Sequence, residues 1–493
     1  MISGGVEVAM TAWQKWLGAE GSLEQAEALS ASWRVSVLGR LAGRLQPWAV
    51  ASWLMPAFEP FCFLVACLYF VLASQAATAP LGLVLLAMAG LLGVQWLTRG
   101  LDVTPVHLPL AVYWGIATLA TLLSPVAYVA RDGWLKLTLY LLGFLLLHQI
   151  LRRPSARSPL IGVTLLVSLW MAVYGIRQYF YGAADLATWV DPESGVAGVT
   201  RVYSFLQNPN LYGGFLVPLL PWGLAAIISW RGWGCQFLAL LITGMNAFCL
   251  VRSLSRGAWL GGLAGLGLMG ILMVQWINPY LPVRWRRWTI PALLTGSLLV
   301  LAVGIWTVEP LRLRFLSIFA GANDTSNNFR LNVWMACLRM IGDFPLLGIG
   351  PGNDAFNRVY PLYQQGNYSA LGAYSVPLEI TLESGLLGIL SFSWFVITLG
   401  VQGWQTWVGL WQQRHPQAWW VAAGLAASLG MAVHGFVDTV WYRPQVQMLW
   451  WLGVALITAP WPVVPSAITQ GSLNLASTGE GHETSARPLD END

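Results

Sequence analysis

Twelve runs of mainly apolar residues follow one another along this chain, and they constrain its fold more than any other feature. Each run is about 17 to 25 residues long, the length that an α-helix needs to cross a bilayer. The sequence therefore predicts an all-α, polytopic membrane protein. The predicted spans cover residues 58–78, 80–98, 106–124, 133–151, 159–180, 209–230, 233–251, 257–277, 289–308, 378–401, 418–437 and 445–464.

The composition excludes several other classes of protein. Hydrophobic residues make up 56% of the chain, charged residues only 10%, and the formal net charge of +4 is spread along it. A nucleic-acid-binding protein would concentrate basic residues on one face, so we expect no nucleic-acid partner. The five Cys form no CxxC motif or Cys/His cluster, which predicts neither a disulfide framework nor a metal site. We expect no cofactor, and the lipid bilayer is the first partner.

The segments around the predicted spans divide the chain into five parts. Residues 1–55 mix Glu, Arg and Trp with small residues, which predicts an amphipathic leader on the cytoplasmic membrane surface or a solvated leader without a role. Spans one to nine (56–308) and ten to twelve (377–465) flank residues 309–376. This long loop carries five Arg and cannot lie in hydrocarbon, so we expect short amphipathic helices in it. The tail, 466–493, has the composition of a disordered segment.

The Lys and Arg of the short loops predict the orientation of the chain. With the N-terminus inside, the inner short loops hold nine such residues and the outer short loops hold five. Because translocation of these charges is disfavoured, both termini should be cytoplasmic and the long loop should lie outside.

Three Arg on the predicted outer side run against this bias. Arg201 precedes an Asn-Pro-Asn sequence, Arg256 begins a span within SLSRG, and Arg330 lies in RLNVW, four residues before Trp334 on a helix that opens near Ser326. An Arg at a helix start adds to the positive end of the macrodipole, which a bound anion would relieve. The guanidinium fork also matches phosphate oxygens. The alternative is that each Arg reaches toward lipid headgroups or pairs with a loop carboxylate.

A His–Asp pair, a Glu pair (Glu379 and Glu383) and a Gly-rich turn complete the candidate site. His434 and Asp438, four residues apart, could place a carboxylate beside an imidazole that acts as a base, or simply pack. Glu379 lies within a span, where acids are costly and mark functional positions; we expect it to face an outer cavity, with a neutral, hydrogen-bonded Glu as the alternative. The sequence PLLGIGPGNDAF predicts a tight turn and then a short helix capped by Asn353.

The motifs NPN, SLSRG, RLNVW, PLLGIGPG and PLEITLESGLLG, in this order, resemble the O-antigen ligase and polymerase superfamily. The ending HGFVDTVWYRPQVQMLWWLGVAL resembles, more narrowly, the cyanobacterial IctB-type branch of bicarbonate transporters. The superfamily resemblance implies a glycosyltransferase that moves a glycan from a polyprenyl diphosphate carrier to an acceptor hydroxyl. Arg201, Arg256 and Arg330 would hold the diphosphate. It also implies a bacterial plasma membrane, or a thylakoid membrane, with the long loop in the periplasm or lumen.

One departure from the family pattern concerns the general base. Ligase-like members carry a His-Asn pair nine residues ahead of a glutamate. Matching that glutamate to Glu383 places Tyr374 and Ser375 at the His-Asn positions. A phenol titrates near pH ~10 and is a poor base at neutral pH. Tyr374, Glu379 and His434 are therefore the candidate catalytic residues of a modified site.

Three functions remain open at this point. The first is an enzyme, or a degenerate enzyme, that binds a lipid-linked glycan. The second is a transporter or accessory protein for bicarbonate, which the same Arg could bind. The third is a scaffold whose outer loop recruits a partner. The first is favoured because the charged residues of interest cluster at the predicted outer surface and not along a path through the spans.

Overall fold

The computed structural model describes residues 51–75, 77–182, 200–307, 309–316, 325–366 and 368–461. The predicted leader up to residue 50 and the predicted tail lie outside these residues. The described residues form helices and no strand, which confirms the all-α prediction. Nine of the described helices are long and apolar enough to cross a membrane.

Each of the twelve predicted spans coincides with one helix. These helices are α4 (Met55–Leu72), α5 (Ala79–Arg99), α6 (His107–Leu122), α7 (Ala127–Leu151), α8 (Pro154–Tyr181), α9 (Pro209–Ser229), α10 (Trp233–Arg252), α11 (Arg256–Ile277), α13 (Thr289–Thr307), α17 (Val376–Gln412), α18 (Ala418–Gly435) and α19 (Pro444–Thr458). The nine long apolar helices leave out α6, α13 and α19. Of these, α6 has 16 residues and α19 has 15, which is shorter than the about 17 to 25 residues that a spanning helix needs.

Local sequence signals fix the starts of two helices that matter for the site. Asn208 caps α9, because its Oδ1 accepts from the N–H of Asn210 at 2.8 Å and of Leu211 at 3.2 Å. Ser255 caps α11 by accepting from the N–H of Ala258 at 3.4 Å. Ser255 lies directly before Arg256, and Asn208 lies seven residues after Arg201.

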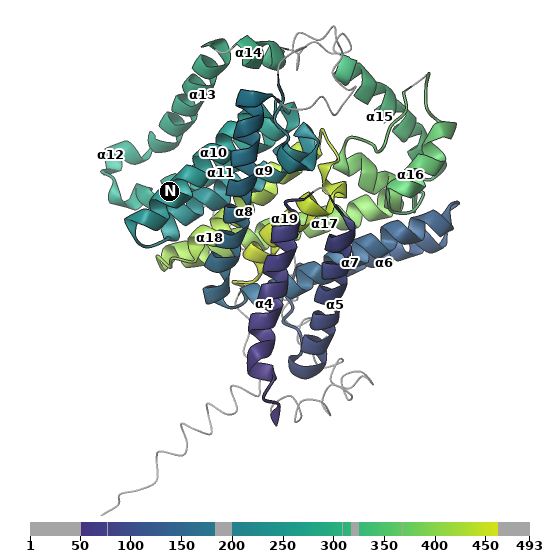
Figure 1. Cartoon of the computed structure of the whole chain (residues 1–493), viewed down its shortest axis with the longest axis horizontal. Coiled ribbons are helices and arrows are strands. Elements are labelled where there is room, and N and C mark those ends of the chain that lie inside the picture. Colours follow the sequence, from purple (N-terminus) through teal and green to yellow (C-terminus); the bar gives the residue numbers. More distant parts are fainter. Residues whose placement is uncertain are drawn as a thin grey trace, which may run out of the picture.

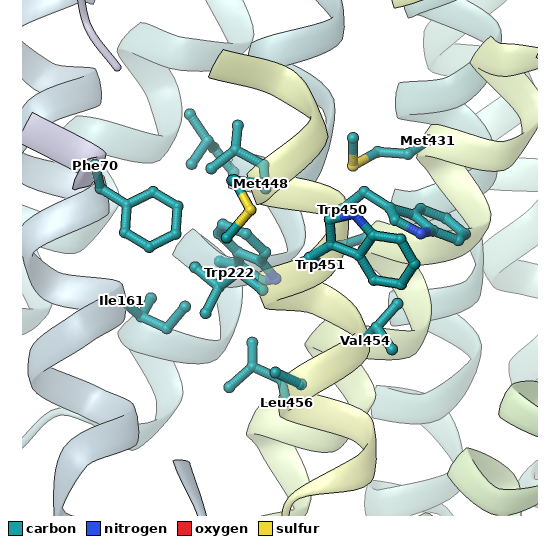
Figure 2. Close-up of a cluster of buried hydrophobic side chains, with 14 of the residues drawn as sticks. Phe70, Ile161, Trp222, Met431, Met448, Trp450, Trp451, Val454 and Leu456 are labelled. Atoms are coloured by element: carbon teal, nitrogen blue, oxygen red, sulfur yellow. The ribbon is translucent and has the colours of Figure 1, made fainter. Parts of the chain in front are cut away.

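The core of the bundle is formed around α18 and α19, which lie among the other spans (Figure 1). Side chains of α19, including Trp450 and Trp451, pack beside Trp222 of α9 and Met431 of α18 (Figure 2). Burial of such large aromatic side chains contributes strongly to packing between helices. In Figure 1, α4 and α5 project from one end of the bundle.

Close approach of α11 and α18 depends on small residues. A methyl group added at Gly261 would lie 2.5 Å from the carbonyl oxygen of Gly430, and one added at Gly265 would lie 2.9 Å from that of Ala426. In membranes, such small-residue contacts let helix backbones pack closely without a hydrophobic driving force. The contact brings the start of α11 next to the end of α18, and these two helix ends contribute to the candidate site.

The long loop is folded over the same end of the bundle. It contains α14 (Glu309–Leu316), α15 (Thr325–Asp343), α16 (Asn353–Val359) and the 3-10 helix η4 (Tyr360–Leu362). One face of α15 buries Val333, Ala336 and Met340 against other loop residues and α17, which confirms the expected amphipathic helices. The expected cap is wrong: Gly352, not Asn353, precedes α16, and the Asn353 amide donates to the carbonyl of Leu371 at 2.8 Å.

Candidate functional site

The first half of the site is formed where the segment before α9 contacts the turn between α10 and α11. Arg201 Nε donates to the carbonyl oxygen of Ser253 at 3.0 Å, and its Nη2 donates to Asn210 Oδ1 at 2.9 Å. The neighbouring N–H of Val202 donates to the carbonyl of Arg252 at 3.1 Å. Arg201 is thus held on the turn that leads directly into Arg256.

Arg256 is the first residue of α11 and is only 7% exposed. Its place at the start of the helix adds a full positive charge to the positive end of the helix dipole. Because Arg201 binds the carbonyl of Ser253, three residues earlier, the structure brings two of the three predicted Arg to one turn. Positive potential at a helix start is the usual environment for a bound phosphate.

The third predicted Arg comes from the loop. Arg330 of α15 lies with Nη2 3.6 Å from Oδ2 of Asp438, which follows α18. One turn along α15, Trp334 donates its indole N–H to the carbonyl of Ala373 at 2.9 Å. The expectation that Arg330 and Trp334 share one side of the helix is confirmed, since both contact the segments that surround the site.

His434 lies between the turn that holds Arg201 and Arg256 and the Arg330–Asp438 pair. A methyl group added at Gly257, next to Arg256, would lie 2.7 Å from Cδ2 of His434, and one added at Gly214 would lie 3.2 Å from its Cε1. The charges of Asp438 and Arg330 also act on this imidazole. His434 therefore connects the Arg256 turn to the Arg330–Asp438 pair.

The predicted shared helical face of His434 and Asp438 is wrong. The α18 helix ends at Gly435, so the four-residue spacing no longer places the two side chains on one helical face. Asp438 instead contacts Arg330 and accepts from the N–H of Thr439 at 2.8 Å. His434 is 1% exposed, and neither ring nitrogen has a hydrogen-bond partner among the described groups.

A buried acidic pair lies beside this cluster in α17. Glu379 Oε2 accepts from the N–H of Ala373 at 2.6 Å, and the Tyr442 hydroxyl is close enough to interact with the same carboxylate. Glu383 Oε1 accepts from the N–H of Gly352 at 2.6 Å and from the hydroxyl of Tyr442 at 2.8 Å. Glu379 is only 3% exposed, so it lies under the loop.

A break in α17 positions these acids. Gly385 has φ +66° inside the helix, which releases the carbonyls of Leu382 and Glu383 from helical bonding. The Gly-rich loop, residues 345–352, binds these two carbonyls. The N–H of Ile349 donates to the carbonyl oxygen of Leu382 at 2.8 Å, and the N–H of Gly350 donates to that of Glu383 at 3.0 Å. Unpaired backbone groups are costly when buried, so loop and helix break stabilise one another.

Tyr374 lies just before α17 in a left-handed backbone conformation, with φ +52°. Its ring meets that of Phe329 of α15 edge to face, with centroids 5.5 Å apart. Burial, and then the neighbouring Asp438 carboxylate, raise the pKa of the Tyr374 phenol above its ordinary value. The phenol stays protonated at neutral pH, so Tyr374 fits the role of a hydrogen-bond donor or stacking group better than that of a base.

Tyr442 is a site residue that the sequence patterns do not identify. It lies in the 3-10 helix η5 (Val440–Tyr442), before the last span, and burial together with Glu379 and Glu383 raises its pKa well above the ordinary value. A phenol that keeps its proton can donate to a carboxylate. The signal available in the sequence was only an aromatic residue at the predicted outer end of a span, which is common at membrane interfaces.

At the loop end of the bundle, Arg201 and Arg256 share one turn, Arg330 pairs with Asp438, and loop backbone binds the Glu379 carboxylate. Among the residues that the structure describes, no group of three or more His, Cys, Asp or Glu side chains could hold a metal ion.

Comparison with known proteins adds a family relationship for part of the chain. Residues 238–393 match the model of the O-antigen ligase family. The matched segment includes Arg256, Arg330, Tyr374 and Glu379, whereas Arg201, His434 and Tyr442 lie outside it. No curated protein gives a significant match to the chain. The protein is therefore a multi-pass membrane protein that is O-antigen ligase-like over this segment.

Proposed function

We propose that this protein binds a polyprenyl diphosphate-linked glycan at the loop end of its bundle and transfers the glycan to an acceptor hydroxyl. The observation that carries the proposal is that the loop end of the bundle holds Arg201 and Arg256 on one turn, Arg330 paired with Asp438, and the Glu379 carboxylate bound by loop backbone. A diphosphate offers several anionic oxygens to guanidinium groups, and each such bond is charge-assisted. The family match over residues 238–393 supports the same chemistry.

The proposed step needs a base and a stabilised leaving group. Glu379 takes the proton of the acceptor hydroxyl, and the acceptor oxygen bonds to the anomeric carbon of the glycan. The bond between this carbon and the diphosphate oxygen breaks, and its electron pair leaves with the lipid diphosphate. The guanidinium groups stabilise the negative charge that develops on the leaving group.

Glu379 suits the role of base better than the other two candidates do. The N–H of Ala373 anchors one oxygen of its carboxylate, and the hydroxyl of Tyr442 interacts with the same group, so the side chain is held in one position. His434 is packed against glycine positions of α9 and α11, and Tyr374 holds its proton. We therefore assign Glu379 as the base, with His434 and Tyr374 as packing or donor groups around the substrate.

We further propose that the loop end faces the periplasm or lumen and that both termini are cytoplasmic. The excess of Lys and Arg in the opposite loops supports this orientation. Lipid-linked glycans assembled for export are used on that side of the membrane, so the orientation agrees with the proposed substrate.

Bicarbonate transport, the function implied by the IctB-type resemblance, is less favoured. In the described spans, most Asp, Glu, Lys and Arg lie near the helix ends, for example Glu59 in α4 and Arg256 in α11. Lys136 lies farther inside α7, and the buried Asn246 and Ser168, within α10 and α8, bond to each other at 2.8 Å. A transport path would need polar groups near the membrane midplane. The scaffold function stays an alternative, because the loop buries one apolar face in its own core but exposes other large apolar side chains: Leu331, Met335, Leu338, Leu346, Leu362 and Leu371.

The test uses the purified protein in liposomes with a polyprenyl diphosphate-linked disaccharide, and bicarbonate flux is measured in parallel. We expect saturable binding of the lipid-linked sugar. In the Glu379→Gln variant, binding should remain while sugar release from the lipid falls by at least about 100-fold. Arg358→Gln is the control, because Arg358 is exposed on α16 and should leave both unchanged. Bicarbonate flux through the protein alone, without binding of the lipid-linked sugar, would overturn the proposal.

A further inference from the structure

A second group of charged residues surrounds a cavity at the opposite end of the bundle. The cavity has a volume of about 430 Å³ and lies where α4 and α8 begin and α5 and α7 end. Ser124, just before α7, donates to the loop carbonyl of Ile349 at 2.5 Å, whereas Arg152, just after α7, lines the cavity. The 25 residues of α7 therefore separate the cavity from the loop end by about 37 Å.

The lining of this cavity carries more positive than negative charge. Three Arg (Arg99, Arg152 and Arg153) face two acids, Glu59 and Asp102. The single carboxylate of Glu59 pairs with both Arg99 and Arg153. Arg152 pairs with Asp102 at 3.2 Å. One carboxylate shared by two guanidinium groups leaves donors that a further anion could bind.

The three Arg are not equally held. Arg152 Nη1 donates to the carbonyls of Ala459 at 3.1 Å and of Trp461 at 2.6 Å, so backbone groups at and beyond the end of α19 fix its position. The side chain of Arg153 is 63% exposed, compared with 23% for Arg152. Arg153 can therefore turn toward a ligand at little cost, while Arg152 remains in place.

The lining of this cavity has apolar walls as well as charged groups, so it suits an amphipathic ligand. Phe63, Ile150 and Pro159 form apolar wall, and Ser155 belongs to the first turn of α8, whose positive dipole end adds to the Arg charges. The cavity volume falls within the range of small-molecule sites. A phosphate diester carries one negative charge and two free oxygens, so it can bridge two guanidinium groups.

We propose that this cavity binds the phosphate diester of an anionic ligand through Arg99 and Arg153. Glu59 is the internal carboxylate that the ligand displaces from one of these two partners. The diester can belong to an anionic lipid headgroup or to a soluble phosphate ester. This site is separate from the candidate transfer site and does not depend on the proposed function.

The experiment uses the full-length protein, stripped of lipid in detergent and examined by native mass spectrometry. The probes are phosphatidylglycerol, phosphatidylcholine with the same acyl chains, and glycerophosphoglycerol, the diester without acyl chains. The double variant Arg99→Gln/Arg153→Gln should bind the diester about tenfold more weakly. Glu59→Gln should bind it more tightly, because the internal competitor is lost. Arg231→Gln is the control: Arg231 is exposed next to Trp230, which bonds Ser158 at this same end.

The outcomes separate the sources of the ligand and can overturn the proposal. Preferential retention of phosphatidylglycerol over phosphatidylcholine supports a lipid headgroup. Binding of glycerophosphoglycerol as strong as that of the lipid supports a soluble ester. Equal retention of both lipids without binding of the soluble diester, or diester affinity that is unchanged in the double variant, overturns the site. Weaker binding in Glu59→Gln would also contradict the proposed displacement.

Discussion

Removing the carboxylate of Asp438 should tighten binding of a diphosphate at the loop end. Asp438 Oδ2 lies 3.6 Å from Arg330 Nη2, and the two side chains are only 10% and 19% exposed. Asp438 therefore competes with an anionic ligand for the same guanidinium. In the Asp438→Asn variant, Arg330 keeps its charge and loses its competitor.

The magnitude follows from the geometry of the pair. At 3.6 Å and an effective dielectric constant of about 20, two opposite unit charges attract by about 4–5 kcal/mol. Desolvation of both groups offsets most of this attraction, which leaves about 1–2 kcal/mol. A ligand that no longer has to displace Asp438 should then bind about 5- to 30-fold more tightly.

A double-mutant cycle measures this effect. The affinity of a polyprenyl diphosphate-linked disaccharide is determined for the wild type, Asp438→Asn, Arg330→Gln and the double variant. Arg330→Gln should weaken binding, and Asp438→Asn should have no effect in its background. Asp354→Asn is the control, because its pair with Lys136 is exposed and lies away from the site. If Asp438→Asn leaves the affinity unchanged, or raises it equally without Arg330, the reasoning fails.

Three further predictions concern the base, the helix contact and the helix break. Because burial raises the pKa of the Tyr374 phenol above its ordinary value, Tyr374→Phe should leave the pH–rate profile of sugar release unchanged below pH ~10, whereas Glu379→Gln should abolish release. Gly261→Ala should lower the thermal unfolding temperature, because the added methyl group would lie 2.5 Å from a backbone oxygen of α18. The control is Gly267→Ala on the same helix, which has open space around it and should leave the unfolding temperature unchanged. Gly385→Ala should destabilise the protein by at least about 1 kcal/mol in thermal or denaturant unfolding, because φ is +66° there and the loop backbone lies 2.1 Å from the added methyl group.

The membrane spans could be predicted because length and hydrophobicity are local properties. Each apolar run long enough to cross a bilayer corresponds to one helix, and the caps at Asn208 and Ser255 follow from residue type and position. The loop helix that carries Arg330 and Trp334 was also evident, because its apolar residues recur at helical spacing.

Contacts between distant segments could not be read in this way. The spacing of His434 and Asp438 predicted a shared helical face, but α18 ends at Gly435 and Asp438 turns to the loop. Glycine within a span does not by itself indicate a break. The break at Gly385 exists because a loop some 35 residues earlier supplies the missing hydrogen-bond partners. Tyr442 belongs to no local motif, and only the fold places it against Glu383.

The dependence of the site on the loop follows from these same bonds. The Gly-rich loop binds the carbonyls released at Gly385, and its Gly352 N–H also holds the side chain of Glu383. The later part of the loop supplies the N–H of Ala373 that holds Glu379. Both acids of α17 are therefore positioned by loop backbone, while Arg330 reaches the site from a loop helix. The spans themselves contribute Arg256 and His434. The proposed anion-binding residues and the two acids of α17 therefore come together only when the loop is folded on the bundle.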